Sequence, residues 1–404
     1  MKLRVWSVKF FYFCTVIPIL CHSDLSEAEW RNLIQQSRNM KNIIELRHIL
    51  HENAELSGKE VKTNAILNEF LEKLNPDLHI RNIGGNGIAV VFKGKNKGKR
   101  LLIRGDIDAL NIPEGGRHCS HRCGHDGHAS IIAGLARRLS EKRPENGEIV
   151  LLFQPAEETG QGAKAVIADP QFEQIKPDMA FALHNIPGYA KNKILLRKGC
   201  FAAGSLGLKL IFDGVTAHAS QPETGHSPQH VLSALIDIFG KKAEMLRDEK
   251  PLTMMTMTHA VLGEETFGVA PSHAEIWLTL RSYDNEKLQH LTADVVQLCA
   301  MVAEKQNFEF GSSIHEAFSA TINNDEAIAI VENAAQSLNL DYQYLDEPFR
   351  WSEDFGRFAD VCPICLFGLG CGEEHLPLHN PEYEFEDEII ETGINIFESL
   401  VASL

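Results

Sequence analysis

The spacing of hydrophobic residues changes along the chain, and each spacing predicts a different element. Apolar residues recur at helical spacing between residues 43 and 50 and again between 61 and 74. Short continuous apolar runs follow at 88–92, 101–103, 149–153 and 179–183. Continuous apolar strands that alternate with helices, such as the helix expected at 129–139, are typical of a sheet buried on both faces. This part of the chain therefore predicts an α/β fold with a mostly parallel central sheet.

A different pattern begins near Ser205. Alternate residues from Leu206 to Phe212 are apolar, as in a strand with one face in water. The next elements expected are a helix at 228–246, strands at 252–261 and 274–283, and a helix at 285–304. This order predicts a small α+β unit in which two helices cover one face of an antiparallel sheet.

After residue 311 the first pattern returns. A helix is expected at 325–338, an apolar strand at 361–367, and a final helix from residue 387. A chain of 404 residues is also longer than a single hydrophobic core usually supports. We therefore expect a larger domain built from residues 24–204 and 312–404, interrupted by a smaller domain at 205–311.

The first 23 residues have the pattern of a secretion signal. Lys2, Arg4 and Lys9 precede an apolar run at 10–20, and small residues precede a cleavage point after Ser23. We expect residues 1–23 to be a signal peptide and the protein to be exported, to the periplasm or outside the cell. The alternative interpretation is an N-terminal extension on a cytoplasmic protein.

Charge and composition exclude several classes of partner. The 55 Asp and Glu residues outnumber 39 Lys and Arg, which gives a net charge of −16. A chain this acidic lacks the basic surface that nucleic acids require, so no nucleic-acid partner is expected. No run of eighteen apolar residues is present, so no integral membrane anchor is expected. Gly-x-Ser-x-Gly, P-loop and Gly-x-Gly-x-x-Gly motifs are also missing, which disfavours serine hydrolases, nucleotidases and dinucleotide-dependent enzymes.

Polar side chains gather directly after the predicted strands. The clusters lie at 104–108, 154–158, 184–185 and 368–379. Ligands of open α/β sheets bind beyond the carboxyl ends of the strands, so these segments are expected to meet at one site.

The chemistry of these clusters indicates a metal-dependent hydrolase. Cys123 and His125 lie in a His-rich loop and are close enough to bind one borderline-soft divalent ion. Glu157 and Glu158 follow a strand, and neighbouring extended residues point apart. One carboxylate could therefore bind metal while the other acts as general base, although such a pair is also compatible with a solvated acidic turn. Near the C-terminus we expect one ligand rather than two, because Pro377 separates His375 from His379.

Together these segments resemble the M20 metallopeptidase superfamily, and most closely its amidohydrolase branch of hippurate, N-acyl-amino-acid and auxin-conjugate hydrolases. The matching stretches span nearly the whole mature chain in the order of that family. They are 46–48, 54–57, 106–110, 123–128, 153–158, 183–184, 217–222, 353–355 and 378–379.

The resemblance implies a catalytic domain that holds two divalent metal ions and is interrupted by a lid or dimerisation domain. The ligands implied by position are Cys123, His125, Glu158, His184 and His379. By the same comparison Glu157 would be the general base, and Asp108 would orient a ligand. His218 from the smaller domain would polarise the scissile carbonyl when the lid closes.

The resemblance also implies the reaction, which is hydrolysis of an N-acyl-amino acid or a related conjugate to release a free amino acid. A dipeptidase or aminopeptidase with the same centre is the alternative. A non-catalytic descendant is a third reading, but it predicts a lost ligand or base and all six are present. Zn or Mn is the expected metal, with Co or Ni as alternatives. A homodimer through the lid is also implied.

One lid motif departs from the family pattern. Where relatives carry Asn in an Asn-x-Ile-Pro motif, this chain has Gly268, followed by Val269, Ala270 and Pro271. The change removes an amide donor, so substrate preference cannot be carried over from relatives at this position.

Overall fold

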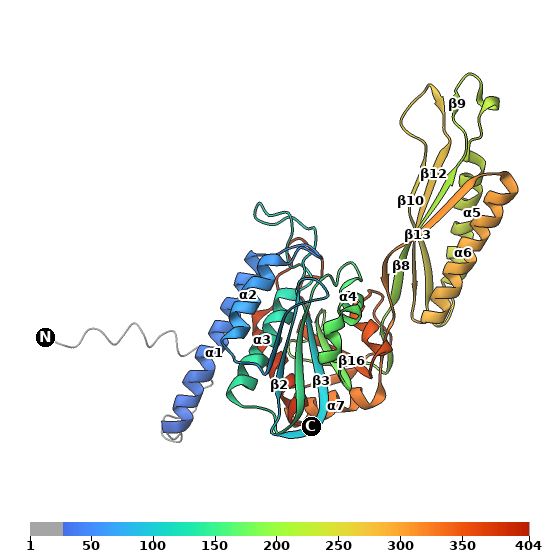
Figure 1. Cartoon of the computed structure of the whole chain (residues 1–404). Helices are drawn as coiled ribbons and strands as arrows, with labels where there is room; N and C mark the ends of the chain where they lie inside the picture. The colour runs from blue at the N-terminus through green and yellow to red at the C-terminus, as the bar shows by residue number, and fades with distance from the viewer. Residues whose placement is uncertain (1–26, 404) are drawn as a thin grey trace.

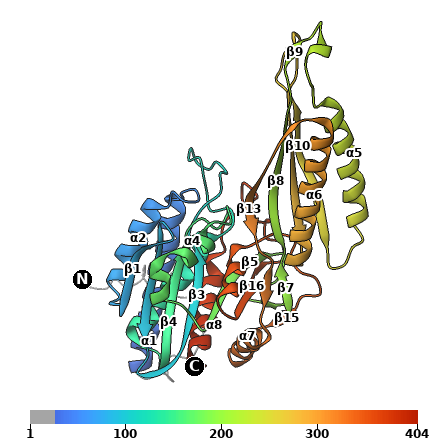
Figure 2. The same cartoon turned by 45° about the vertical axis from the view of Figure 1, so that its right-hand side comes forward.

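The computed structural model describes residues 27–403, with side chains described from residue 40. It contains a large domain built on an eight-stranded sheet and a smaller domain that projects from it (Figures 1 and 2). Within residues 27–403 no helix combines the length and hydrophobicity needed to cross a membrane. The predicted signal peptide at 1–23 lies outside the described residues and stays a prediction.

The central sheet has the strand order β1-β2-β4-β3-β5-β16-β6-β15. Its strands are β1 (Leu78–Ile83), β2 (Gly87–Lys93), β3 (Asn96–Asp106), β4 (Asn146–Gln154), β5 (Met179–Pro187), β6 (Ile194–Leu196), β15 (Tyr342–Tyr344) and β16 (Ile364–Gly372). The four middle strands, β4, β3, β5 and β16, are parallel. β1, β2 and β4 pair antiparallel on one side, and β6 pairs antiparallel with β16 on the other. The predicted α/β class with a mostly parallel centre is confirmed.

Both faces of this sheet are covered, which explains the continuous apolar runs. Leu101 and Ile103 of β3 face one core and Leu102 faces the other, and all three are buried. The first face is covered by α1 (Glu27–Glu52), α2 (Val61–Glu72), α3 (His125–Glu141), α7 (Asp325–Ser337) and α8 (Ile390–Ala402). The second is covered by α4 (Gly162–Ala168) and the 3-10 helices η1 (Pro170–Gln174) and η3 (Asp354–Asp360). A strand buried on both sides has no polar face, so alternation disappears.

The smaller domain, called the lid below, is a four-stranded antiparallel sheet in the order β10-β12-β8-β13. Its elements are β8 (Gly204–Asp213), α5 (Gln229–Leu246), β10 (Thr253–Leu262), β12 (His273–Ser282), α6 (Asn285–Gln306) and β13 (Glu309–Phe318). The apolar residues at alternate positions of β8 pack against α5 and α6, so both helices lie on one face (Figure 1). The expected boundary at residue 311 falls inside β13, because this edge strand is mostly exposed and lacks an apolar pattern.

Two short antiparallel ladders mark the two ends of the lid. At its base, β7 (Gly199–Ala202) pairs with β14 (Thr321–Asn323), where the chain enters and leaves the lid. At the far end, β9 (Ala217–His218) pairs with β11 (Val269–Ala270), and the 3-10 helix η2 (Pro222–Thr224) follows. We call this far end the lid tip. Both views place β9 away from the central sheet (Figures 1 and 2). A last 3-10 helix, η4 (Asp387–Ile389), precedes α8.

Candidate metal centre

Six side chains from four separate segments meet beyond the carboxyl ends of the parallel strands. Cys123 lies just before α3 and His125 is its first residue, Glu157 and Glu158 follow β4, His184 belongs to β5, and His379 follows β16. Their donor atoms form three overlapping groups, each with all atoms within 4.8 Å of one another. The groups are Cys123–His125–His184, Cys123–Glu158–His379 and His125–Glu157–Glu158. The structure therefore brings together every expected ligand and the expected base, with Cys123 shared between two groups.

Backbone turns that disfavour ordinary residues place three of these side chains. Gly124 between Cys123 and His125 has φ of 93°, and a Cβ there would lie 2.7 Å from the Asn185 side chain. His379 is itself in the left-handed region with φ of 66°, and its N–H donates to the Arg122 carbonyl at 2.8 Å. Non-glycine residues rarely adopt this conformation unless surrounding contacts hold it, and such sites cluster at functional positions.

A third residue with a left-handed backbone conformation precedes Glu157 and Glu158 and sets their orientation. Ala156 has φ of 53°, and its N–H donates to Glu60 at 2.9 Å. The turn presents Glu157 and Glu158 to the same region, and the Glu158 N–H donates to Asp108 at 3.0 Å. Both carboxylates therefore take part in one site, and the solvated acidic turn is not what forms.

Hydrogen bonds orient the two buried imidazoles. His125 Nδ1 contacts the Asp108 carbonyl oxygen at 3.0 Å and its carboxylate at 3.2 Å. His184 Nδ1 contacts the Asn185 carbonyl oxygen at 2.9 Å. In both rings the Nε2 atom is then the one directed at the shared site, and His184 Nε2 lies 3.5 Å from Cys123 Sγ. The partner on the second nitrogen is what fixes ring orientation at metal centres.

The unsatisfied atoms of the site fit a metal. His125 Nε2 and Glu158 Oε1 are buried without a hydrogen-bond partner and lie 3.7 Å apart. Buried polar atoms without a partner are costly, and a cation between them removes that cost. Thiol, imidazole and carboxylate together form a donor set suited to divalent zinc-like ions.

The electrostatics also favour added positive charge. Burial raises the pKa of the Cys123 thiol to about 12 and that of Glu158 to about 7. Burial, reinforced by Glu353 and Glu158, also raises the pKa of Glu157 well above its usual range. These groups hold their protons because the protein alone leaves them short of cationic partners. A divalent ion reverses this preference, since coordination favours the deprotonated form.

A buried charge network that the sequence did not reveal supports Glu157. The Arg104 guanidinium is 1% exposed and donates to Asp106 at 2.7 Å and to Glu353 and Asp354 at 2.8 Å each. The Asp354 N–H in turn donates to Glu157 Oε1 at 3.2 Å. The available signal was an arginine at the end of the apolar run 101–103, with the acidic pair 353–354 as its partner far along the chain.

His218, the lid residue expected to act at the metal centre, lies away from that centre. His218 is exposed at the lid tip, where its Nδ1 contacts Ser220 Oγ at 2.7 Å. The Gly268 carbonyl accepts the Ala219 N–H at 3.0 Å, so the altered motif is beside it. Strand β9, which carries His218, lies far from β5 and β16 in Figure 2, so the structure does not bring His218 to the metal centre of the same chain. The sequence placed His218 in the lid but could not place the lid relative to the site.

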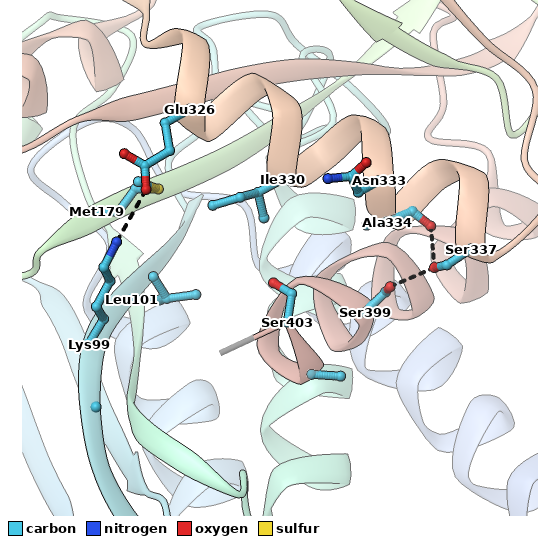
Figure 3. A pocket seen from close by; sticks show the side chains of 12 residues that line it. Lys99, Leu101, Met179, Glu326, Ile330, Asn333, Ala334, Ser337, Ser399 and Ser403 are labelled. Atoms are coloured by element: carbon cyan, nitrogen blue, oxygen red, sulfur yellow. Dashed lines mark hydrogen bonds and ion pairs between the residues drawn. The ribbon is translucent and has the colours of Figure 1, made fainter.

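A pocket lies at the other end of the sheet, away from the metal centre. It measures about 770 Å³, is bordered by α7, α8 and the starts of β3 and β5, and has the Lys99–Glu326 ion pair at its rim (Figure 3). Met179 lines it at the first residue of β5, whereas the metal centre begins at His184 near the other end. This pocket is therefore separate from the site described above.

The fold and the site define a two-domain hydrolase with a candidate dinuclear metal centre. Residues 102–403 match the family described as Peptidase family M20/M25/M40, and the chain belongs to this family. The resemblance inferred from the sequence motifs is therefore confirmed.

Relatives of known description cover most of the chain. A hippurate hydrolase from Campylobacter jejuni is 29% identical over 91% of this chain and 98% of its own length. An N-acetyl-L-cysteine deacetylase from Bacillus subtilis is 30% identical over 93% of this chain and 91% of its own. A crystal structure of a Bacillus subtilis dinuclear metal-binding M20 peptidase superposes with a TM-score of 0.74 at 22% identity, covering 91% of this chain and 98% of that one. The last comparison supports the fold.

Proposed function

We propose that this protein is a metal-dependent amidohydrolase that cleaves N-acyl-amino acids or related conjugates and releases a free amino acid. The observation that carries the proposal is the meeting of five metal-type donors with the buried carboxylate of Glu157. The hippurate hydrolase and deacetylase relatives support this choice of reaction. A peptidase with the same centre is the competing function, favoured by the peptidase description of the structural relative.

The ions are proposed to bind Cys123, His125, Glu158, His184 and His379. Zn or Mn suits this mixture of thiolate, imidazole and carboxylate, and Co or Ni is the alternative. When bound, divalent ions polarise the amide oxygen and make an attacking water more acidic. Asp108 holds the His125 ring by its carbonyl and carboxylate oxygens, so its proposed role is to position this ligand.

Glu157 is proposed to move the proton. Its carboxylate would take a proton from the attacking water while the new carbon–oxygen bond forms. It would then give that proton to the leaving nitrogen as the carbon–nitrogen bond breaks. The hydrogen bond from the Asp354 N–H fixes the carboxylate in position for both events.

We propose that His218 acts on the site of a second copy in a homodimer. Ser352 donates to Ser205 Oγ at 2.8 Å at the lid base, and the adjacent Trp351 ring lies 5.1 Å from His184. The site is therefore close to the lid base. The ten-residue strand β8 separates the base from the tip by roughly 30 Å. Rotation of the lid about its base preserves this separation, so closure within one chain would not bring the tip to its own site.

The test is a metal-removal and add-back assay on a substrate panel. Chelated protein is reloaded with Zn, Mn, Co or Ni and assayed on N-acetyl- and N-benzoyl-amino acids beside dipeptides. We expect turnover of the acylated substrates only after metal is restored. Faster cleavage of dipeptides would favour the peptidase, and no turnover of any substrate by metal-loaded protein would reject both functions.

A further inference from the structure

Trp351 lies beside the metal centre without any role in the reaction proposed above. Its ring centroid is 5.1 Å from that of His184, with the planes tilted by 40°. The side chain is only partly buried, in contrast to the His184 ring it packs against. A substrate whose amide carbon reaches the ions would carry its substituents into this same neighbourhood.

Other aromatic rings support Trp351 from behind. Phe349 stacks on it with centroids 4.9 Å apart and planes at 22°. Phe201, which is fully buried, lies 6.2 Å away at 72°. The three rings form one packed cluster, since Phe201 and Phe349 are also in contact at 5.3 Å. Because this cluster belongs to the core of the large domain, Trp351 presents a firm apolar surface next to polar chemistry.

The backbone around Trp351 is held on both sides. Its carbonyl accepts the Ala203 N–H at 3.0 Å, and lid residue Arg281 donates to the preceding carbonyl of Arg350 at 2.9 Å. Two and three residues further on are Glu353, which pairs with Arg104, and Asp354, whose N–H holds Glu157. The position of the indole is therefore fixed relative to both a ligand and the base.

We propose that Trp351 is a specificity-determining residue and that this enzyme prefers conjugates with an aromatic ring next to the scissile amide. This inference rests on the proposed amidohydrolase function. A ring in the acyl part or in the amino-acid part would stack against the indole, whereas an acetyl group offers only a methyl. Such ring pairs add stabilisation beyond the area they bury, and apolar burial adds the rest.

The kinetic test compares N-acetylglycine, N-benzoylglycine and N-acetylphenylalanine. For wild type we expect a higher kcat/KM for at least one ring-bearing substrate than for N-acetylglycine. The ratio of kcat/KM for that ring-bearing substrate to kcat/KM for N-acetylglycine should fall about tenfold in W351A. W351F should keep most of this ratio. A loss confined to N-benzoylglycine places the ring in the acyl site, and a loss confined to N-acetylphenylalanine places it in the amino-acid site. An equal loss for all three substrates, or no loss, overturns the proposal.

A binding measurement separates this inference from the proposed reaction. In a metal-loaded E157Q background, calorimetry would compare the affinities of N-benzoylglycine, N-acetylphenylalanine and N-acetylglycine with and without W351A. The preference for a ring-bearing conjugate should fall about tenfold, with metal content unchanged. W277A removes an exposed lid tryptophan and is the matched control. If wild type turns over none of the substrates but this binding preference is seen, only the function fails. If turnover occurs and the preference is unaffected by W351A, only the role of Trp351 fails.

Discussion

The metal centre and the lid tip hold their functional side chains in opposite ways. At the metal centre, His125 and His184 are buried and each has its second ring nitrogen held by a hydrogen bond. At the tip, His218 is exposed, and Phe267, two residues before the Val269 that pairs with His218, is fully exposed. A pre-organised site needs its partners within the fold, whereas the exposed His218 side chain has no such buried support. The groups that orient the metal-centre imidazoles thus lie within the chain itself, whereas the tip leaves His218 open to another surface, as the proposed dimer requires.

The same contrast holds for charge. Arg104 pairs with three carboxylates in the core of the large domain, all of them nearly inaccessible to water. In the lid, Lys209 and Glu275 form an ion pair at 2.7 Å that solvent partly reaches. Burial makes charge pairing strong and its loss costly, while solvent weakens surface pairs. Substitutions in the buried part of the large domain and in the lid should therefore differ in the size of their effects as well as in the property they affect.

The largest effect is expected at the proposed base. Glu157→Gln keeps the shape and the acceptor for the Asp354 N–H but cannot take a proton. We expect kcat to fall on the order of 10³-fold while metal content measured by mass spectrometry stays at the wild-type level. Glu158→Gln is the matched control, since loss of a ligand should lower metal content as well. Retention of most activity by Glu157→Gln would reject Glu157 as the base.

A smaller effect is expected at the lid tip, and it tests whether the tip serves a second copy. Removing a donor to a developing oxyanion lowers kcat by about 10²–10³-fold, which is the loss expected for His218→Ala. Metal content and unfolding temperature should not change, because His218 is exposed.

Mixing two inactive variants shows whether His218 acts on the site of its own chain or on the site of its dimer partner. A hybrid of Glu157→Gln and His218→Ala subunits has one intact site only if His218 acts across the dimer. Random exchange of subunits makes half the dimers hybrid, so about a quarter of wild-type activity should return. Activity that stays at the level of the separate variants would show that His218 acts within its own chain or not at all.

Much of this arrangement could be predicted from the sequence because parallel strands of one sheet end at the same edge. Residues far apart along the chain therefore lie close together there. The apolar runs at 101–103, 149–153 and 179–183 correspond to β3, β4 and β5, and the polar residues that follow them meet at one edge. The acidic pair was harder, since only the left-handed turn at Ala156 decides that both carboxylates face the site.

Features that depend on long-range packing could not be predicted. Two of the three carboxylate partners of Arg104, Glu353 and Asp354, lie about 250 positions away, and no local pattern connects them to it. Strand β13 carries a mostly exposed sequence and is defined by its pairing with β8. The position of His218 depends on how the whole lid projects from the large domain, which the residues around His218 do not encode.

The smallest effect is expected from His273, a partly exposed histidine of the lid, and it measures how little such surface charge pairs stabilise the fold. His273 contacts Asp213 at 2.6 Å and Glu275 at 3.2 Å, and Glu275 also pairs with Lys209. The hydrogen bond to Asp213 is the main cause that raises the pKa of His273. A raised pKa means that the folded lid favours protonated His273. The resulting stability is complete below the unfolded pKa of about 6.5 and is lost as pH rises through the higher folded value.

Hydrogen exchange of β8 and β12 in the full chain measures this contribution. Comparison of wild type with His273→Gln at the same pH cancels the intrinsic dependence of exchange on pH. Wild type should be more protected by a few tenths of a kcal/mol near pH 6, and the difference should vanish toward alkaline pH. His290→Gln on the exposed surface of α6 is the control and should show no such trend. A difference of several kcal/mol would contradict the comparison. It would mean that a partly exposed pair in the lid stabilises the fold as strongly as the buried network around Arg104.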